Sequence, residues 1–136
     1  MPFTIRPQTA GDCEELRALE EEVFDCEVIS LLSFRRFVTS PSIASFVVRD
    51  EERLIGYATV FFRAKSRVAR VYSIGVLPAY RGHGLGQTLL ETCENAARER
   101  GCQYLRLEVK IDNPRAAAFY ERHGFSPIGE IFETPG

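Results

Sequence analysis

Three glycines alternate with other residues at positions 82, 84 and 86, just before a segment with the apolar spacing of a helix. Glycine adopts positive φ and lets another group approach the backbone closely, so several N–H groups can converge on one anion. A helix that starts here adds the positive end of its dipole at the same place. We therefore expect this stretch to bind a pyrophosphate.

Two other phosphate-binding loops fit the stretch poorly. A Walker A loop ends in Gly-Lys-Ser/Thr, whereas Gly86 is followed by Gln87 and Thr88. In the dinucleotide fingerprint G-x-G-x-x-G, the third glycine lies elsewhere than at position 86. A merely flexible loop is a third alternative, and Pro78, Arg81 and the well-formed helix that follows argue against it.

Two side chains further along the chain could exchange protons with a substrate. Glu108 lies in a predicted strand on the same face as Arg106 and Lys110, so a salt bridge there explains it about as well as catalysis does. Tyr120 lies in the helix that follows, and a phenol has a usual pKa of about 10. Its alternative role is to pack against the sheet together with Phe119.

The order of the predicted elements indicates an α+β fold. Asp12 and Glu15 are expected to form a capping box at the first helix, and Asn113 and Gly124 to begin and end the last one. We expect an antiparallel meander followed by one β-α-β crossover, which creates a parallel pair. The predicted strands are 3–6, 45–49, 54–62, 67–76, 104–111 and 125–132, and two further helices are 31–38 and 85–100.

Length and charge exclude several classes of protein. A chain of 136 residues fits one core, so 1–136 is expected to be a single domain. A net charge of −2 argues against electrostatic binding to nucleic acid or to an anionic membrane. No apolar run is long enough for a membrane span, and the first residues do not resemble a signal peptide.

The cysteines predict neither a metal site nor a disulfide framework. They form no C-x-x-C pair and have no histidine at zinc-finger spacing; they are Cys13, Cys26, Cys93 and Cys102. We expect reduced thiols in a cytoplasmic protein and no bound metal.

The motif Arg81-x-x-Gly84-x-Gly86 resembles the R/Q-x-x-G-x-G/A signature of the GNAT superfamily. The resemblance covers roughly residues 54–125 and includes the helix that starts at Asn113. It is closest to the ribosomal-protein alanine N-acetyltransferase subgroup, which carries Leu-Glu-Val and then an asparagine-led helix ending in tyrosine. The resemblance implies a GNAT-like mixed sheet, an antiparallel meander plus a splayed parallel pair, flanked by helices.

The resemblance also implies acetyl-CoA as the acyl donor. One strand would pair through its backbone with the pantetheine arm, and the glycine-rich loop would hold the pyrophosphate mostly through main-chain amides. Asn113 matches a cofactor-contacting asparagine of the subgroup. The implied cofactor-binding residues are Ile74, Gly75, Val76, Arg81, Gly82, His83, Gly84, Leu85, Gly86, Gln87 and Asn113.

The activity implied by the resemblance is direct transfer of an acetyl group to an amine, with Glu108 as general base and Tyr120 as the acid that protonates the thiolate. An α-amine, with a pKa near 8, is neutral more often at pH 7 than a lysine, which favours a peptide or protein α-amine or a small-molecule amine. No cysteine falls at a predicted site position, so no covalent intermediate is expected. The alternative is a non-catalytic acyl-CoA-binding sensor or interaction domain.

The C-terminal segment departs from the family pattern. Only twelve residues follow Gly124, and only one of the two usual strands fits them, so the last strand is expected to be missing. Because an exposed edge can pair with another chain, a homodimer completed by a second copy is one expected arrangement. The tyrosine-rich tail of the ribosomal-protein enzymes is also absent, which argues against their particular substrate.

Overall fold

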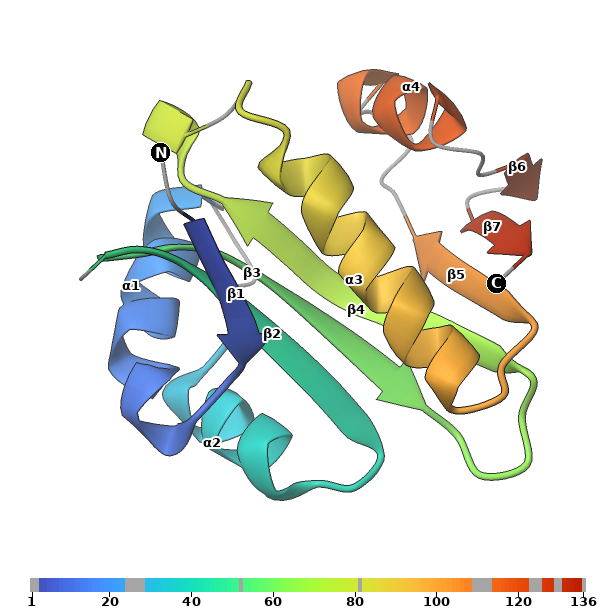
Figure 1. Cartoon of the computed structure of the whole chain (residues 1–136), viewed down its shortest axis with the longest axis horizontal. Helices are drawn as coiled ribbons and strands as arrows, with labels where there is room; N and C mark the ends of the chain where they lie inside the picture. The colour runs from blue at the N-terminus through green and yellow to red at the C-terminus, as the bar shows by residue number, and fades with distance from the viewer. Residues whose placement is uncertain are drawn as a thin grey trace.

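The computed structural model describes residues 3–23, 29–51, 53–80, 82–108, 114–122, 126–128 and 131–135. Within these residues, seven strands form one mixed sheet in the order β1-β2-β3-β4-β5-β7-β6 (Figure 1). The strands are β1 (Phe3–Pro7), β2 (Ile43–Asp50), β3 (Arg53–Phe62), β4 (Val68–Val76), β5 (Tyr104–Glu108), β6 (Ser126–Ile128) and β7 (Ile131–Pro135). The α-helices are α1 (Cys13–Val23), α2 (Leu31–Thr39), α3 (Leu85–Glu99) and α4 (Pro114–Arg122). The predicted α+β class is confirmed.

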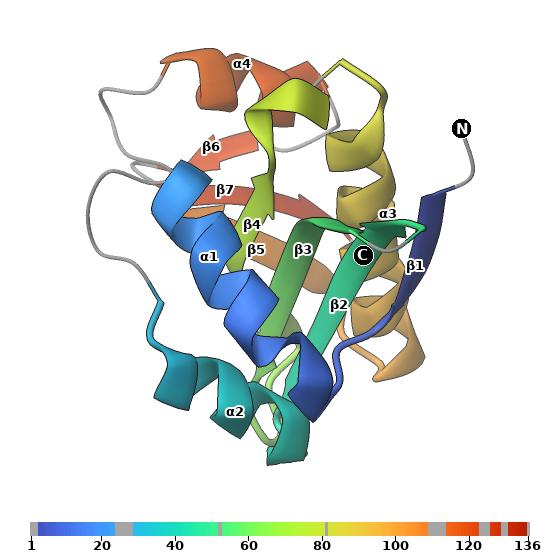
Figure 2. The ribbon, with the colours of Figure 1, turned by 90° about the vertical axis from the view of Figure 1, so that its left-hand side faces the viewer.

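Helices cover both faces of the central strands because strand side chains alternate between the two faces. Tyr57 on β3 is fully buried, and its ring centroid lies 5.8 Å from that of Phe34 on α2. On the opposite face, a Cβ at the neighbouring Gly56 would lie 3.6 Å from Leu89 of α3. We call these the α1 face, which α1 and α2 cover, and the α3 face (Figure 2).

β4 and β5 form the predicted parallel pair, and α3 is the crossover between them. Their pairing runs from Val68 opposite Tyr104 to Val71 opposite Leu107, and no pair follows in the described residues although β4 continues to Val76. The described pairing therefore covers one end of β4, and β5 is described only one residue beyond it, to Glu108. The predicted parallel pair is confirmed, and its predicted splay concerns residues beyond the described end of β5.

A β-bulge on β4 lies where the parallel pairing ends. Val71 and Ser73 pair with neighbouring residues of β3, so Tyr72 between them is an extra residue. An extra residue bends its strand and disrupts the ladder locally. The bulge thus lies directly after Val71, where the described pairing between β4 and β5 ends.

The prediction that the last strand is missing is wrong. Two strands follow α4, and β7 pairs antiparallel with β6 on one side and with β5 on the other. β6 has only three residues, shorter than the usual strand, and this is how a hairpin fits into so short a segment. Because β7 covers the edge of β5, the unpaired edge that suggested a homodimer is already paired within the chain.

The described cysteines Cys13, Cys93 and Cys102 are buried free thiols, and Cys26 lies outside the described residues. Within the described residues, no group of three or more His, Cys, Asp and Glu could hold a metal ion. None of the helices in the same residues is long and apolar enough to cross a membrane.

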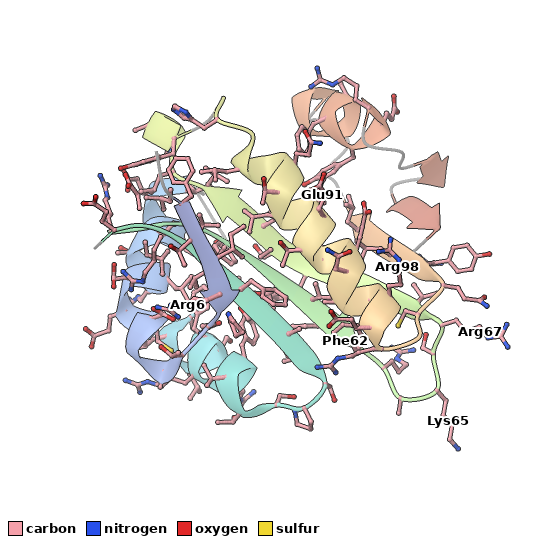
Figure 3. The ribbon with its side chains drawn as sticks, in the orientation of Figure 1. Arg6, Phe62, Lys65, Arg67, Glu91 and Arg98 are labelled. Atoms are coloured by element: carbon pink, nitrogen blue, oxygen red, sulfur yellow. The ribbon has the colours of Figure 1, made fainter. Side chains whose placement is uncertain are left out.

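A cluster of charges around the buried Asp12 fixes α1 to the sheet. Its carboxylate accepts two hydrogen bonds of 2.8 Å from Arg6 of β1, labelled in Figure 3, and one of 3.0 Å from Arg49 of β2. It also accepts a hydrogen bond of 2.8 Å from the Thr9 amide, so the capping box consists of Thr9 and Asp12. The predicted capping box of Asp12 and Glu15 is wrong. A short 3-10 turn precedes α1 and moves the cap one turn earlier, and Glu15 accepts Arg49 at 2.6 Å.

This cluster makes the free energy of unfolding depend on pH. Burial raises the pKa of Asp12, but the hydrogen bonds from Arg6, Thr9 and Arg49 outweigh burial and hold that pKa well below its usual range. A carboxyl with a lowered pKa stabilises the folded state above the unfolded pKa of about 4, and this contribution is lost as the pH falls.

We expect Asp12→Asn to lower the free energy of unfolding by about 2 kcal/mol at pH 7, because the new amide nitrogen cannot accept the arginine hydrogen bonds. The difference from the original chain should be smaller at pH 3, where the original chain has lost part of the contribution of Asp12. Urea unfolding at the two pH values measures both quantities. Glu22→Gln, at an exposed position of α1, the helix that follows Asp12, is the control; an equal effect of both substitutions would contradict the assignment.

Candidate functional site

The glycine-rich loop between β4 and α3 has the backbone geometry expected of an anion-binding site. Gly82 has φ of +89° and Gly84 has φ of +76°, in the region that residues with a Cβ rarely adopt. Both glycines and His83 between them are exposed. Apart from each glycine and its chain neighbours, no heavy atom of the described residues lies within 4 Å of the position that a Cβ would take at either glycine. The space over the loop is therefore open to a ligand.

The first turn of α3 supplies amide donors beside this space. Gly84 is the N-cap, and its carbonyl accepts the amide of Thr88 at 3.1 Å. This is the first hydrogen bond of the helix. The three preceding amides have no acceptor inside the helix; they are those of Leu85, Gly86 and Gln87. Together with the helix dipole, they suit a group with the charge of a pyrophosphate.

Gly86, the third glycine of the motif, has a different structural role from the other two. A Cβ at this position would lie 3.1 Å from Cζ of Phe119 on α4, which is tighter than ordinary van der Waals contact. The absence of a side chain therefore lets α4 pack over the start of α3, as Figure 1 shows. Sequence reasoning assigned Gly86 only to the loop, because nothing local indicates which helix packs against it.

Tyr120 lies next to Phe119 on α4, with the two ring centroids 5.4 Å apart and the rings in an edge-to-face arrangement. Both side chains are partly buried and pack against the hydrophobic core. Burial, with a smaller contribution from Cys93 of α3, raises the pKa of Tyr120 to about 12. The phenol therefore keeps its proton throughout the neutral pH range.

Ile74, Gly75 and Val76 lie on the part of β4 beyond the parallel pairing. Their backbones pair with β3 on one side. On the side toward β5, the described residues show no pairing after Val71. An edge of β4 left unpaired here would present backbone N–H and C=O groups, which suit an extended ligand that contains amides, such as a pantetheine arm.

Glu108 is the last residue of β5, one position beyond the parallel pairing, and it pairs with Ile131 of β7. Its backbone therefore lies at the end of the described pairing between the two parallel strands. The side chain of Glu108, and the whole of Arg81 and Asn113, lie outside what the structure describes. Their predicted roles stay predictions.

A buried polar network that sequence reasoning missed connects α1 to β4. The carboxylate of Glu20, on α1, accepts hydrogen bonds from the phenol of Tyr57 and, at 3.0 Å, from the amide of Ile29. Tyr57 is also hydrogen-bonded to Ser73, directly after the bulge. One signal was present in the sequence: Glu20 lies four residues after Leu16, on the apolar side of α1.

A cavity of about 550 Å³ lies at the other end of β4, near the β3–β4 turn that carries Lys65 and Arg67 in Figure 3. Its lining includes Arg63, Arg70 and Arg106, and none of the predicted site residues. The candidate site is therefore the loop, the end of β4 beyond Val71 and the part of α4 that carries Phe119 and Tyr120, at the opposite end of that strand.

The comparisons with known proteins agree with this geometry. The model of the acetyltransferase (GNAT) family matches residues 12–125. The chain is 35% identical, over an alignment of 136 residues, to the N-alpha-acetyltransferase RimI of Mycobacterium tuberculosis, covering 94% of this chain and 81% of that relative. It is 36% identical over 81 residues, 60% of this chain, to a mycothiol acetyltransferase of Jonesia denitrificans, but spans only 26% of that longer protein.

Solved structures share the fold. The ribosomal-protein-S18-alanine N-acetyltransferase of Escherichia coli matches with a TM-score of 0.87 and 23% identity, over 98% of this chain and 94% of that one. The PaiA N-acetyltransferase of Thermoplasma acidophilum, solved in complex with coenzyme A, matches with a TM-score of 0.89 and 20% identity over the whole of both chains. The loop and the end of β4 beyond Val71 fit such a donor. The chain belongs to the acetyltransferase (GNAT) family, as an acetyl-CoA-dependent N-acetyltransferase.

Proposed function

We propose that residues 1–136 form one domain that transfers the acetyl group of acetyl-CoA directly to the α-amine of a peptide or protein. The observation that carries this proposal is the end of the described pairing of β4 with β5 at Val71, with the glycine-rich loop after β4 and with Tyr120 next to Phe119, which packs against Gly86. A donor along the edge of β4 and an acceptor in the gap would meet at that point.

The donor contacts are assigned to the described backbone and to two residues of the family motif. The edge at Ile74, Gly75 and Val76 would bind the pantetheine arm, and the amides from Gly82 to Gln87, with the exposed His83 between the loop glycines, would hold the pyrophosphate. Arg81 and Asn113 are assigned as further contacts from the resemblance alone. When bound, acetyl-CoA supplies the activated thioester.

Direct transfer is supported by the state of the described cysteines. Burial, with a smaller contribution from Glu94, raises the pKa of Cys93 to about 12, so its thiol is protonated and unreactive at neutral pH. Cys13 and Cys102 are also buried. A protonated thiol is a poor nucleophile, and a buried one is out of a substrate's reach, so Cys93 on both grounds and Cys13 and Cys102 by burial are poor candidates for an acetyl-cysteine intermediate.

Tyr120 is proposed to donate a hydrogen bond to the departing sulfur. A thiol has a usual pKa of about 8.5, so complete transfer from a phenol with a pKa of about 12 is uphill. The phenol would therefore stabilise the negative charge as it develops on sulfur, and the proton would move completely only late in the step. Burial of the ring suits this role because it keeps the phenol neutral.

Glu108 is proposed as the general base, because its backbone lies at the end of the described pairing between the two parallel strands. A free α-amine has a pKa near 8 and a lysine near 10.4, so an α-amine needs less help to lose its proton at pH 7. The N-alpha-acetyltransferase name of the RimI relative supports the same acceptor class. A small-molecule amine is the alternative acceptor.

We further propose that the protein acts in the cytoplasm. A homodimer is no longer required to complete the sheet, because β7 pairs with the edge of β5.

The acceptor class is tested with a panel of peptides in two forms, one with a free α-amine and one with the α-amine blocked and a free lysine. We expect turnover of the first form and at least tenfold less of the second, measured by release of coenzyme A. Preference for small polyamines would identify the alternative acceptor. Tight binding of acetyl-CoA without acetylation of any amine would support the non-catalytic sensor.

Gly84→Val is expected to weaken acetyl-CoA binding at least tenfold in calorimetry, because the new side chain strains a residue at φ of +76° and fills the open space over the loop. Gly101→Val is the matched control: Gly101 follows the other end of α3, has φ of +78° and also has no atom within 4 Å of a Cβ. Both variants should lose thermal stability. Equal affinity of the two variants for acetyl-CoA would refute the loop as the binding site.

Tyr120→Phe should lower kcat by about 100-fold and leave the KM for acetyl-CoA unchanged, because it removes a proton donor and keeps the ring. Since the pKa of Tyr120 is about 12, the phenol is protonated from pH 6 to 10 and the loss should be constant over that range. Tyr104→Phe, which removes an exposed phenol from β5, is the control. Full turnover of Tyr120→Phe would show that another group protonates the sulfur.

A further inference from the structure

Glu20 is a carboxylate in the interior of the protein, with 1% of its surface exposed. Each of its oxygens has a donor: Oε1 accepts the amide of Ile29, and Oε2 accepts the phenol of Tyr57, which is itself fully buried. Two donors and no acceptor around the group favour its ionised form. A buried charge of this kind is costly to keep, so its position needs a reason beyond packing.

The hydrogen bonds of this network run in one direction. A phenol has one hydrogen, and Tyr57 gives it to the carboxylate of Glu20. Tyr57 must then accept in its bond with Ser73, so the hydroxyl of Ser73 is the donor there. The lone pairs of Ser73 Oγ stay available to accept a proton from outside the network. The order is therefore Ser73 to Tyr57 to Glu20, with each hydrogen pointing toward the carboxylate.

Ser73, the outer residue of this hydrogen-bond network, lies at the proposed reaction site. Ser73 is half-buried, follows the bulged residue Tyr72 and precedes Ile74. It lies two positions beyond Val71, the last residue of β4 that pairs with β5. Its pairing with Thr59 and its bond to Tyr57 put its side chain on the α1 face, opposite the face that α3 covers.

We propose that Ser73, Tyr57 and Glu20 form a proton relay that deprotonates the acceptor amine. The inference rests on the proposed function and adds a second proton path beside Glu108. The acceptor binds as an ammonium, and before its nitrogen bonds to the acetyl carbon one N–H bond breaks and the proton passes to Ser73 Oγ, which leaves the electron pair on nitrogen for the attack. The proton of Ser73 passes to the oxygen of Tyr57, and that of Tyr57 to the carboxylate of Glu20. The reverse path returns the proton to water after the product leaves.

The electrostatics of the network support this direction. Burial raises the pKa of Glu20, and the hydrogen bonds from Tyr57 and Ile29 offset part of that rise. A carboxylate with a raised pKa is a stronger base than one in water and is better matched to an α-amine. Burial and the charge of Glu20 raise the pKa of Tyr57 well above its usual value, with Tyr72 adding to the rise and Ser73 opposing it. Tyr57 therefore passes a proton on without becoming a phenolate.

Ser73→Ala tests the relay at its accessible end, using the full chain and the best acceptor peptide from the panel. Without the relay, the amine must lose its proton in solution, where an α-amine with a pKa of about 8 is neutral in only about 1 part in 30 at pH 6.5. We expect kcat/KM for the peptide to fall about 30-fold at pH 6.5 and to approach the original value above pH 9. Affinity for acetyl-CoA should not change.

Three further variants separate the relay from packing. Ser73→Thr keeps the hydroxyl and should retain activity, whereas Tyr57→Phe keeps the ring and should show the same pH-dependent loss as Ser73→Ala. Ser45→Ala removes another buried hydroxyl of the same face, bonded to Thr59 at 2.9 Å, and should change stability alone. The relay is refuted if Ser73→Ala matches the original chain from pH 6 to 9, if its loss is the same at every pH, or if Ser73→Thr loses as much. An original chain that acetylates no amine would refute the proposed function as well.

Discussion

Adjacent parallel strands that are fully hydrogen-bonded leave no space for a ligand between them, so a site between β4 and β5 requires that their ladder be interrupted. The extra residue Tyr72 provides this interruption without loss of the sheet, because β4 remains paired with β3 before and after the bulge. β5 in turn is held from its other side by β7. The C-terminal hairpin thus holds β5 in the sheet at the point where the pairing of β5 with β4 ends.

The sheet divides the chemistry between its two faces. In the proposed arrangement, the loop at the start of α3, together with Phe119 and Tyr120 of α4, lies on the side of the donor. On the α1 face, Glu20 reaches β4 through Tyr57 and Ser73. In the proposed arrangement the leaving sulfur and the attacking nitrogen therefore exchange protons with different groups on opposite sides of one gap. The ion pairs of Asp12 support this division indirectly, because they hold α1 against β1 and β2.

Sequence reasoning predicted the parts of this molecule that depend on local chemistry. Glycines at 82 and 84 adopt the positive φ that their spacing suggested, and the crossover and the parallel pair follow from element order. The C-terminal hairpin was missed because a three-residue strand carries too little periodicity to be recognised and is stabilised by pairing with distant residues. The network of Glu20 was missed for a related reason: its partners come from β3 and β4, far away in the chain.

The contact between Gly86 and Phe119 links two parts of the molecule that the sequence separates by more than thirty positions. A methyl group added at position 86 would require the ring of Phe119 to shift by a few tenths of an ångström, and Tyr120 lies directly against that ring. In the proposed arrangement, a larger residue in the loop therefore disturbs the proposed proton donor as well, and a smaller residue at position 119 would offset it. Donor binding and acid catalysis would then depend on one packing contact.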